Sequence, residues 1–567
     1  MNGITPEDRG SLTSLQRPVQ KKYAAARHPH IISHVGRLIV NDITCDSGGR
    51  LWGAVTCGVA AWEASEGGVF YELWHVEHGM AGNDTRCIIT AGERVIVGHE
   101  SGCISLYENE QWQILAEGVQ FPVRALAVGS DGVIYGATDT GVYDATHNKL
   151  LRTPEPVLSV CQWYDDLFVG TASGVYMHLY EDTWERHPIS EHHQMVTALR
   201  TAHRDLWIGS QMGPVRIRAD GSQTAFPWAG PVLAMDSYRG SIAVGTTRGV
   251  YVPPDDTGES NVDGRMPLVA VNQKGFAFGD SDNLYYFIDR TEFLCDLLPQ
   301  MADRKQMQFD RAHKATPQIV RTYSTGDARW LQDVEGYLWK HSAKKPDFVT
   351  VDSNAPVTGV ATLNGKTVLG LNSGHGIATV DGLAATLNHG VQFVTALTVH
   401  EDAFYAAGRD GLFRSVDGET WANVDNMVTH AGLVHALLPY GDALLVVARR
   451  GLFTLADAVF SPYRHFETIR AAASDDQQAA LILPDGVTQL APGGATENIP
   501  LPEGIKPLCL VYYEGTLYAG TSTGIWACSQ GYFERVFPEI RTSVLNLTIH
   551  QTSIQAVTAT GLLQITL

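Results

Sequence analysis

The stretch Leu517–Trp526 reads LYAGTSTGIW, and the fold follows from its recurrence along the chain. Close copies stand at Leu167–Tyr176 (LFVGTASGVY) and Ile242–Tyr251 (IAVGTTRGVY). Each copy holds an apolar strand that ends in Gly-Thr, two polar residues, a second glycine and another apolar strand. Two apolar runs joined by a short turn with glycine are typical of a β-hairpin. The chain is therefore expected to repeat one hairpin many times.

The second glycine of the phrase marks each copy and sets the repeat length. It stands at Gly58, Gly102, Gly141, Gly174, Gly213, Gly249, Gly336, Gly376, Gly411, Gly451, Gly486, Gly524 and Gly561. One further copy carries Asn283 at this place, and asparagine is the residue that tolerates a positive φ best after glycine. The mean spacing of the markers is about 39 residues, close to the about 40–50 residues of a propeller blade.

Each repeat contains more than the hairpin. An apolar run such as Val123–Val128 precedes the phrase, and a strand with an aromatic residue such as Thr183–Arg186 follows it. Four strands per repeat, without helical periodicity, are typical of a propeller blade. We predict an all-β tandem β-propeller of about 14 four-stranded blades that form two seven-bladed rings. A stacked β-solenoid is the alternative fold.

The longest interval between markers, Asn283 to Gly336, indicates the boundary between the two rings. The predicted domains are an amino-terminal arm at 1–36 that contains a candidate ring-closing strand, a first propeller at 37–298, a linker or insertion at 299–317 and a second propeller at 318–567.

The last repeat reaches Leu567 directly after its third strand, so its fourth strand has to come from elsewhere. An unpaired sheet edge is a liability that closed rings remove. The segment His30–Val35 belongs to no repeat of its own, and it is one candidate for the missing strand. A segment within residues 301–317 is the other candidate.

The run Asp205–Ser210 (DLWIGS) and the copies that begin at Leu167 and Leu517 resemble the repeats of two-component-regulator-type bacterial propellers, and more broadly WD-like and kelch-like repeats. The resemblance extends over nearly the whole chain from about residue 36. It implies the propeller fold and no particular activity, because many unrelated activities occur on such rings. The Trp-Asp and Gly-His signatures of true WD repeats are missing.

The run Ser415–Trp421 (SVDGETW) resembles the Asp-box of sialidases, although it is one residue shorter. In that family the Asp-box is a folding hairpin at the edge of a blade. We therefore expect a structural turn here and no catalytic residue.

The composition restricts the cellular compartment and the classes of binding partner that we expect for this chain. The 567 residues carry a formal net charge of −20, which disfavours nucleic acid as a partner. Short basic pairs such as Lys21-Lys22, Lys344-Lys345 and Arg449-Arg450 are expected to be solvated surface. The first residues lack the apolar core of a secretory signal, and no apolar run is long enough for a transmembrane helix. Eight scattered cysteines without a CxxC pair favour a reducing cytoplasm.

The sequence contains no clear catalytic, cofactor or metal motif. Glu191-His192-His193 and the pair His28 and His30 lack the spaced partners of a zinc site. The carboxylates Asp255, Asp256, Glu259 and Asp263 match no calcium pattern. The turn Asn372–Gly376 opens a strand, so it offers no helix N-terminus to a phosphate. The arginines that a sialidase-like triad would draw on occupy different repeat positions: Arg124, Arg200, Arg248, Arg409 and Arg449. Of these, Arg248, Arg409 and Arg449 are expected at exposed turns.

Two function classes remain open. The favoured one is a cytoplasmic scaffold or adaptor subunit that binds other proteins through propeller faces and loops, with no catalytic, cofactor or metal residue. The alternative is a propeller enzyme, or a small-molecule or glycan binder, that uses the axial pocket of one ring. Convergence of His, Arg, Tyr and carboxylate side chains at one channel mouth would favour the alternative.

Overall fold

The structure is a computed structural model of the chain. It describes residues 19–20, 26–34, 39–56, 58–65, 68–117, 121–238, 241–251, 262–263, 265, 267–271, 275–279, 284–288, 293–296, 319–326, 328–334, 336–341, 346–351, 356–388, 390–425, 432–457, 459–466, 468–475, 477–491 and 495–567. The predicted linker at 299–317 and the marker Asn283 lie outside these residues.

The chain divides into two compact units. Unit 1 comprises Met1–Pro29 and Arg37–Thr316, and unit 2 comprises His30–Gly36 and Pro317–Leu567. Both units consist of β-sheets in which consecutive strands pair antiparallel, so the all-β class is confirmed. In the described part of the chain, no helix is long and apolar enough to cross a membrane.

The strands of unit 1, grouped by sheet, are as follows. The first three sheets contain β1 (Val19–Gln20), β3 (Val40–Cys45), β4 (Leu51–Val55), β5 (Gly58–Ser65) and β6 (Gly68–Trp74); β7 (Thr85–Ala91), β8 (Arg94–His99), β9 (Ile104–Glu108) and β10 (Gln111–Ala116); and β11 (Ala125–Val128), β12 (Ile134–Thr138), β13 (Gly141–Asp144) and β14 (Lys149–Arg152). The other sheets contain β15 (Ser159–Trp163), β16 (Asp166–Gly170), β17 (Val175–Tyr180) and β18 (Thr183–Arg186); β19 (Ala198–Ala202), β20 (Asp205–Ser210), β21 (Gly213–Ile217) and β22 (Gln223–Ala225); β23 (Val232–Tyr238), β24 (Ser241–Thr246), β25 (Gly249–Tyr251) and β26 (Val262–Asp263); and β27 (Leu268–Val271), β28 (Gly275–Gly279), β29 (Leu284–Ile288) and β30 (Phe293–Asp296). Short 3₁₀ helices lie at η2 (Val76–His78), η3 (Pro188–Glu191) and η4 (Pro227–Ala229).

The strands of unit 2 follow the same plan, except that the fourth strands of the first two groups, Pro346–Val351 and Ala384–Asn388, pair in parallel and join these groups into one eight-stranded sheet. They are β31 (Ile319–Thr325), β32 (Ala328–Asp333), β33 (Leu338–His341) and β34 (Pro346–Val351); β35 (Val357–Leu363), β36 (Lys366–Leu371), β37 (Ile377–Asp381) and β38 (Ala384–Asn388); β39 (Ala396–His400), β40 (Ala403–Gly408), β41 (Gly411–Ser415) and β42 (Ala422–Asp425); β43 (Val434–Tyr440), β44 (Ala443–Ala448), β45 (Gly451–Ala456) and β46 (Val459–Arg464); β47 (Ala471–Ser474), β48 (Ala479–Leu483), β49 (Gly486–Leu490) and β50 (Thr496–Ile499); β51 (Pro507–Tyr513), β52 (Thr516–Thr521), β53 (Gly524–Ser529) and β54 (Tyr532–Val536); and β2 (Ile31–His34), β55 (Val544–His550), β56 (Ser553–Thr558) and β57 (Gly561–Thr566).

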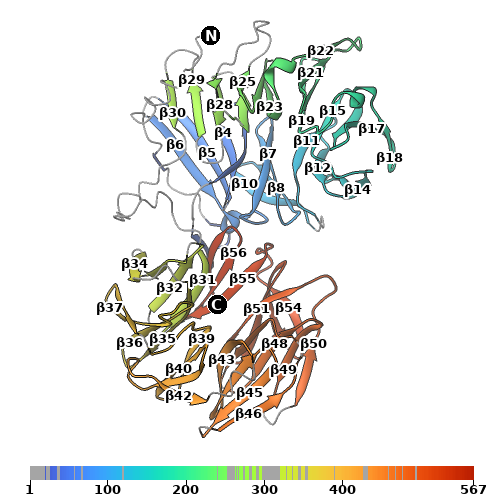
Figure 1. The fold of residues 1–567 in the computed structure, drawn as a ribbon. Helices are drawn as coiled ribbons and strands as arrows, with labels where there is room; N and C mark the ends of the chain where they lie inside the picture. The colour runs from blue at the N-terminus through green and yellow to red at the C-terminus, as the bar shows by residue number, and fades with distance from the viewer. Residues whose placement is uncertain are drawn as a thin grey trace. The chain divides into compact units, whose positions relative to one another are not determined.

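The sheets of each unit form a closed circle through their first strands. In unit 1 each first strand contacts the next in the order β3, β7, β11, β15, β19, β23 and β27, and β27 contacts β3. In unit 2 the order is β31, β35, β39, β43, β47, β51 and β55, and β55 contacts β31. A closed circle of such sheets, most of them four-stranded, is the β-propeller architecture, so the tandem propeller fold is confirmed (Figure 1).

The final sheet of unit 2 obtains its outer strand from the amino-terminal part of the chain. Strand β2 pairs antiparallel with β57, with Ile31 opposite Ile565 and His34 opposite Leu562. Of the two candidate segments, the one at the amino terminus therefore supplies the fourth strand, at Ile31–His34. This strand belongs to unit 2, while the chain from Arg37 onward builds unit 1.

The Gly-Thr pair of the repeat has two separate physical roles. The glycine allows the first strand of the next sheet to approach, since a Cβ on Gly520 would lie 2.8 Å from the side chain of Val544. The threonine locks the hairpin, because the Thr521 hydroxyl donates to the carbonyl oxygen of Gly524 over 3.0 Å. The same bond joins Thr138 to Gly141, Thr171 to Gly174, Thr246 to Gly249 and Thr558 to Gly561.

Several marker glycines adopt a conformation beyond the left-handed one that the sequence pattern predicted. The φ angle is +136° at Gly58, +150° at Gly141 and +142° at Gly561, outside the left-handed helical region that asparagine tolerates. The backbone also leaves no room, since a Cβ on Gly141 would lie 2.1 Å from the carbonyl oxygen of Leu151. Glycine is therefore required at such positions for steric reasons as well as for conformation.

The apolar core lies between neighbouring sheets. One cluster joins the first two sheets of unit 1 through Trp52, Trp74, Met80, Ile88 and Trp112, all of them buried. Burial of such alternating apolar positions is the main favourable contribution to folding.

Candidate functional site

The turns that carry the repeat phrase gather at one end of each sheet. In the sheet β43–β46, Val434 at the start of the first strand pairs with Ala448 at the end of the second. The segment that leads into β43 and the turn between β44 and β45 therefore lie at the same end. We call this end of the unit 2 sheets the turn face of unit 2.

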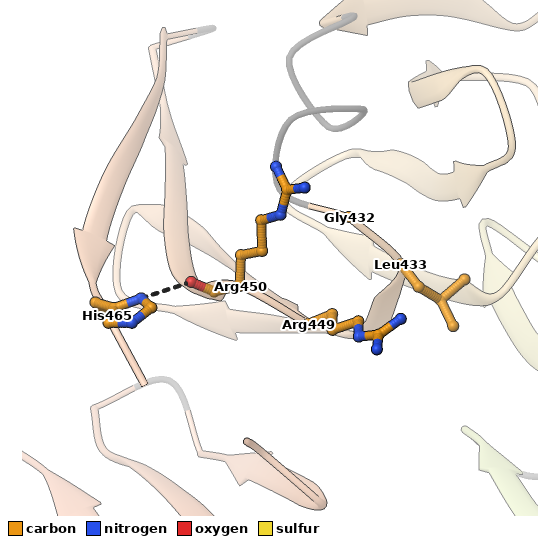
Figure 2. Close-up of a pocket in the computed structure, with 5 residues that line it drawn as sticks. All are labelled: Gly432, Leu433, Arg449, Arg450 and His465. Carbon is orange, nitrogen blue, oxygen red and sulfur yellow. Dashed lines mark hydrogen bonds between the residues drawn. The ribbon is translucent and has the colours of Figure 1, made fainter. Parts of the chain in front are cut away.

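A basic pocket opens on the turn face. It has a volume of about 490 Å³ and is lined by Gly432, Leu433, Arg449, Arg450 and His465 (Figure 2). Arg449 and Arg450 form the turn, Gly432 and Leu433 precede β43, and His465 follows β46. Three of these residues are basic and none carries a carboxylate. The pocket thus concentrates positive charge on a chain whose net charge is −20.

Backbone hydrogen bonds fix the pocket walls. The N–H of Arg449 donates to the carbonyl oxygen of Leu433 over 2.9 Å. The Nδ1–H of His465 donates to the carbonyl oxygen of Arg450 over 3.0 Å, and Figure 2 shows this bond. The turn is therefore held on both sides, by the segment before β43 and by the residues after β46.

The neighbouring turn of unit 2 has a similar construction. Arg409 is exposed at the turn between β40 and β41, and its N–H donates to the carbonyl oxygen of Gln392 over 2.9 Å. Its guanidinium lies 5.8 Å from the ring centre of Phe393, within reach of a cation–π contact. Arg248, Arg409 and Arg449 all lie at exposed turns, as the sequence predicted.

The histidine candidates do not form a metal site in the described part of the chain. His193 Nδ1 lies 3.0 Å from the Ser210 hydroxyl, and burial lowers its pKa. His28 belongs to unit 1 and His30 to unit 2. Among the described residues, no group of three or more His, Cys, Asp or Glu side chains is placed to hold a metal ion.

Of the acidic candidates, Asp255, Asp256 and Glu259 lie outside the described residues, and Asp263 ends strand β26. In the Asp-box-like run, Asp417 Oδ1 accepts the N–H groups of Glu419 and Thr420, each over 2.8 Å. Those N–H groups, that of Thr420 first, hold the pKa of Asp417 below its usual range. The run is a hairpin turn between β41 and β42, as expected.

Unit 1 contains a buried polar cluster that the sequence patterns did not reveal. His99 Nδ1 lies 3.3 Å from Asp84 Oδ1, and His99 Nε2 lies 2.8 Å from the Ser105 hydroxyl. The order Asp-His-Ser resembles a hydrolase triad. However, Ser105 and His99 are both fully buried, and the Ser105 oxygen also accepts the N–H of Ala81 over 2.9 Å. A substrate therefore has no access to this serine. The role of the cluster is structural, because its hydrogen bonds connect the segment before β7 with β8 and β9.

The first strands of unit 1 bring opposite charges within electrostatic reach. Burial raises the pKa of Asp42 (β3) to about 6, although the N–H of Ile88 and the charge of Arg200 (β19) oppose the shift. Asp236 (β23) raises this pKa further. Both oxygens of Asp42 accept backbone N–H groups, from Ile43 and Ile88, each over 2.9 Å. Asp42 therefore connects two first strands of the ring.

No family model matches the chain, and no curated protein matches it. Among solved structures, PorZ, a surface component of the type-IX secretion system of Porphyromonas gingivalis, has a TM-score of 0.62 at 10% identity over 94% of this chain and 87% of that one. The extracellular domain of BT4673 from B. thetaiotaomicron has a TM-score of 0.37 at 12% identity over 94% and 82%. Virginiamycin B lyase from Staphylococcus aureus has a TM-score of 0.36 at 10% identity over 44% and 95%.

The two closed circles of antiparallel sheets define the chain as a tandem β-propeller protein. Its resemblance to bacterial β-propeller repeat proteins is confirmed at the level of fold. The similarity is of fold alone at these identities, because unrelated activities share such rings.

Proposed function

We propose that the chain is a protein–protein interaction scaffold or adaptor that binds partners through the turn face of unit 2. The observation that carries this proposal is the basic pocket of Leu433, Arg449, Arg450 and His465. Arginine is enriched at the centres of protein interfaces, where its planar group forms several hydrogen bonds. Loops on a rigid scaffold are also the usual place of binding residues.

The experiment is affinity capture from the native source with the full-length chain as bait. The decisive comparison is between the double variant Arg449→Ala/Arg450→Ala and the control Arg248→Ala, which changes an exposed turn of unit 1. We expect a reproducible partner that the control retains and the double variant loses. Recovery of a lone monomer, or equal capture by both variants, contradicts the proposal.

We further propose a reducing compartment, the cytoplasm, as the place of action. Cysteines 45, 87, 103, 161 and 509 are buried free thiols, and Cys528 is a partly exposed one. Burial raises the pKa of Cys161 to about 12, which keeps this thiol unreactive. Fractionation of the native cells with an antibody to the chain tests the compartment, and recovery in a surface or extracellular fraction contradicts it.

A further inference from the structure

The basic pocket presents charge and apolar surface together. We propose that it binds an acidic peptide segment of a partner protein, with carboxylates at Arg449 and Arg450 and an apolar side chain against Leu433. This inference rests on the proposed interaction function and specifies the chemistry of the partner.

In this proposal the two arginines bind two carboxylates of the ligand rather than one. Figure 2 shows the side chains of Arg449 and Arg450 extending in different directions from the turn, with the guanidinium of Arg449 on the side of Leu433. Adjacent residues of the turn thus direct their charges to different parts of the pocket. A ligand that places carboxylates at two points along its length fits this arrangement better than a single compact anion does.

The size and the apolar wall of the pocket also favour a peptide. Its volume of about 490 Å³ falls within the range of about 300–1,000 Å³ that is usual for ligand pockets, and a lone inorganic anion would fill only a small part of it. Leu433 is 55% exposed at its edge. Covering this side chain with an apolar residue of the ligand removes apolar surface from water. An acidic segment with interspersed apolar residues supplies both kinds of contact.

The pocket is preorganised for binding. The N–H of Arg449 is bonded to Leu433, and the carbonyl of Arg450 is bonded to His465. Gly451 closes the turn with φ +129°, and a Cβ there would lie 2.7 Å from the carbonyl oxygen of Arg464. Because the backbone is already fixed, binding requires little further loss of conformational freedom.

The charge of the whole chain disfavours a long polyanion. With a net charge of −20, the chain repels nucleic acid beyond the immediate pocket. A short acidic segment contacts only the local positive region. The proposal therefore commits to a peptide, and nucleic acid becomes an outcome of the test.

The test uses fluorescence anisotropy with the full-length chain and a labelled short peptide of glutamate and leucine. Comparison probes are the same peptide with glutamine in place of glutamate, inorganic phosphate as competitor, and single-stranded DNA of equal charge. We expect Arg449→Ala and Arg450→Ala each to weaken peptide binding about tenfold, as the loss of one charged hydrogen bond implies. Arg248→Ala should leave it unchanged, and the thermal unfolding of each variant checks that it folds.

The outcomes separate this inference from the proposed function. Equal binding of the glutamate and glutamine peptides overturns it, as does unchanged affinity in the double arginine variant, tighter binding of DNA, or competition by phosphate at equal charge concentration. If the double variant loses the captured partner but the acidic peptide does not bind, the interaction function stands and the acidic-peptide inference is wrong. Loss of peptide binding in both single variants, but not in the control, supports it.

Discussion

Ile31 of β2 lies directly opposite Ile565 of β57, and both side chains are buried, at 1% and 0% exposure. This pair joins residues more than five hundred positions apart in sequence and completes the final sheet of unit 2. Because β57 would otherwise present an open edge, the pair closes the ring. The closure depends on a segment that precedes all of the repeats.

We expect Ile31→Ala to destabilise unit 2 by about 2–4 kcal/mol, since it removes a buried branched side chain. The neighbouring residue Ile32 is 48% exposed, so Ile32→Ala is the matched control and should cost less than about 1 kcal/mol. Thermal unfolding of the full chain measures both. Equal losses in the two variants would show that β2 contributes no specific packing. Deleting residues 1–36 should lower the stability of unit 2 further, and an unchanged melting curve would contradict the closure.

Gly141→Ala should destabilise unit 1 by more than about 2 kcal/mol. Its φ is +150°, and the new Cβ would lie 2.1 Å from the carbonyl oxygen of Leu151. Strain and steric overlap thus add together. Gly132→Ala is the control, because Gly132 has φ +84° but no atom within 4 Å of the added Cβ. Urea unfolding compares the two variants. If both lower the unfolding midpoint equally, the positive φ alone explains the loss and the steric overlap at Gly141 contributes nothing.

The sequence predicted the propeller because its signal is local and repeated. The phrase around Gly524 contains the strand, the turn and the hydroxyl that locks it within ten residues. The spacing of such phrases then indicates blades. Even the strand that closes unit 2 could be proposed, since the count of strands in the last repeat left one place empty.

The candidate site could not be predicted in the same way, because its residues come from separate segments. Arg449 and Arg450 are visible in the sequence only as a short basic pair, which was expected to be plain surface. Leu433 and His465 carry no motif, and only the fold brings them together with the arginines. The cluster of Asp84, His99 and Ser105 was missed for the same reason, because Asp84 precedes β7 while Ser105 lies within β9.

We expect Ser105→Ala to destabilise unit 1 by about 1–3 kcal/mol, because it leaves the N–H of Ala81 and the Nε2 of His99 without their buried partner. A fluorophosphonate probe, which labels accessible nucleophilic serines, should leave Ser105 unmodified in the folded chain. Mass spectrometry of the treated protein measures this. Labelling at Ser105 would instead support a hydrolase site.

Asp42 should make the stability of unit 1 depend on pH in a defined direction. Burial raises its pKa from the ordinary 3.8 to about 6, so the folded state holds the proton more tightly than the unfolded state does. The stabilisation from the bound proton is fully present below about pH 4 and is lost as the pH rises through 6. With allowance for partial contact with solvent, this change is about 2 kcal/mol.

The variant Asp42→Asn isolates the effect. An asparagine cannot accept both N–H bonds, so the variant is less stable throughout, but its side chain does not titrate. Urea unfolding measures the free energy of unfolding of both proteins. We expect the difference between the natural chain and this variant to shrink by about 2 kcal/mol between pH 4 and pH 7.

Asp84 provides the contrast. Burial acts to raise the pKa of Asp84, but the hydrogen bonds from His99 and Ser101 outweigh that effect and lower this pKa. The free energy of unfolding of the natural chain, relative to that of Asp84→Asn, should therefore increase as the pH rises through the acidic range. If the two differences change with pH in the same direction, the raised pKa of Asp42 is contradicted.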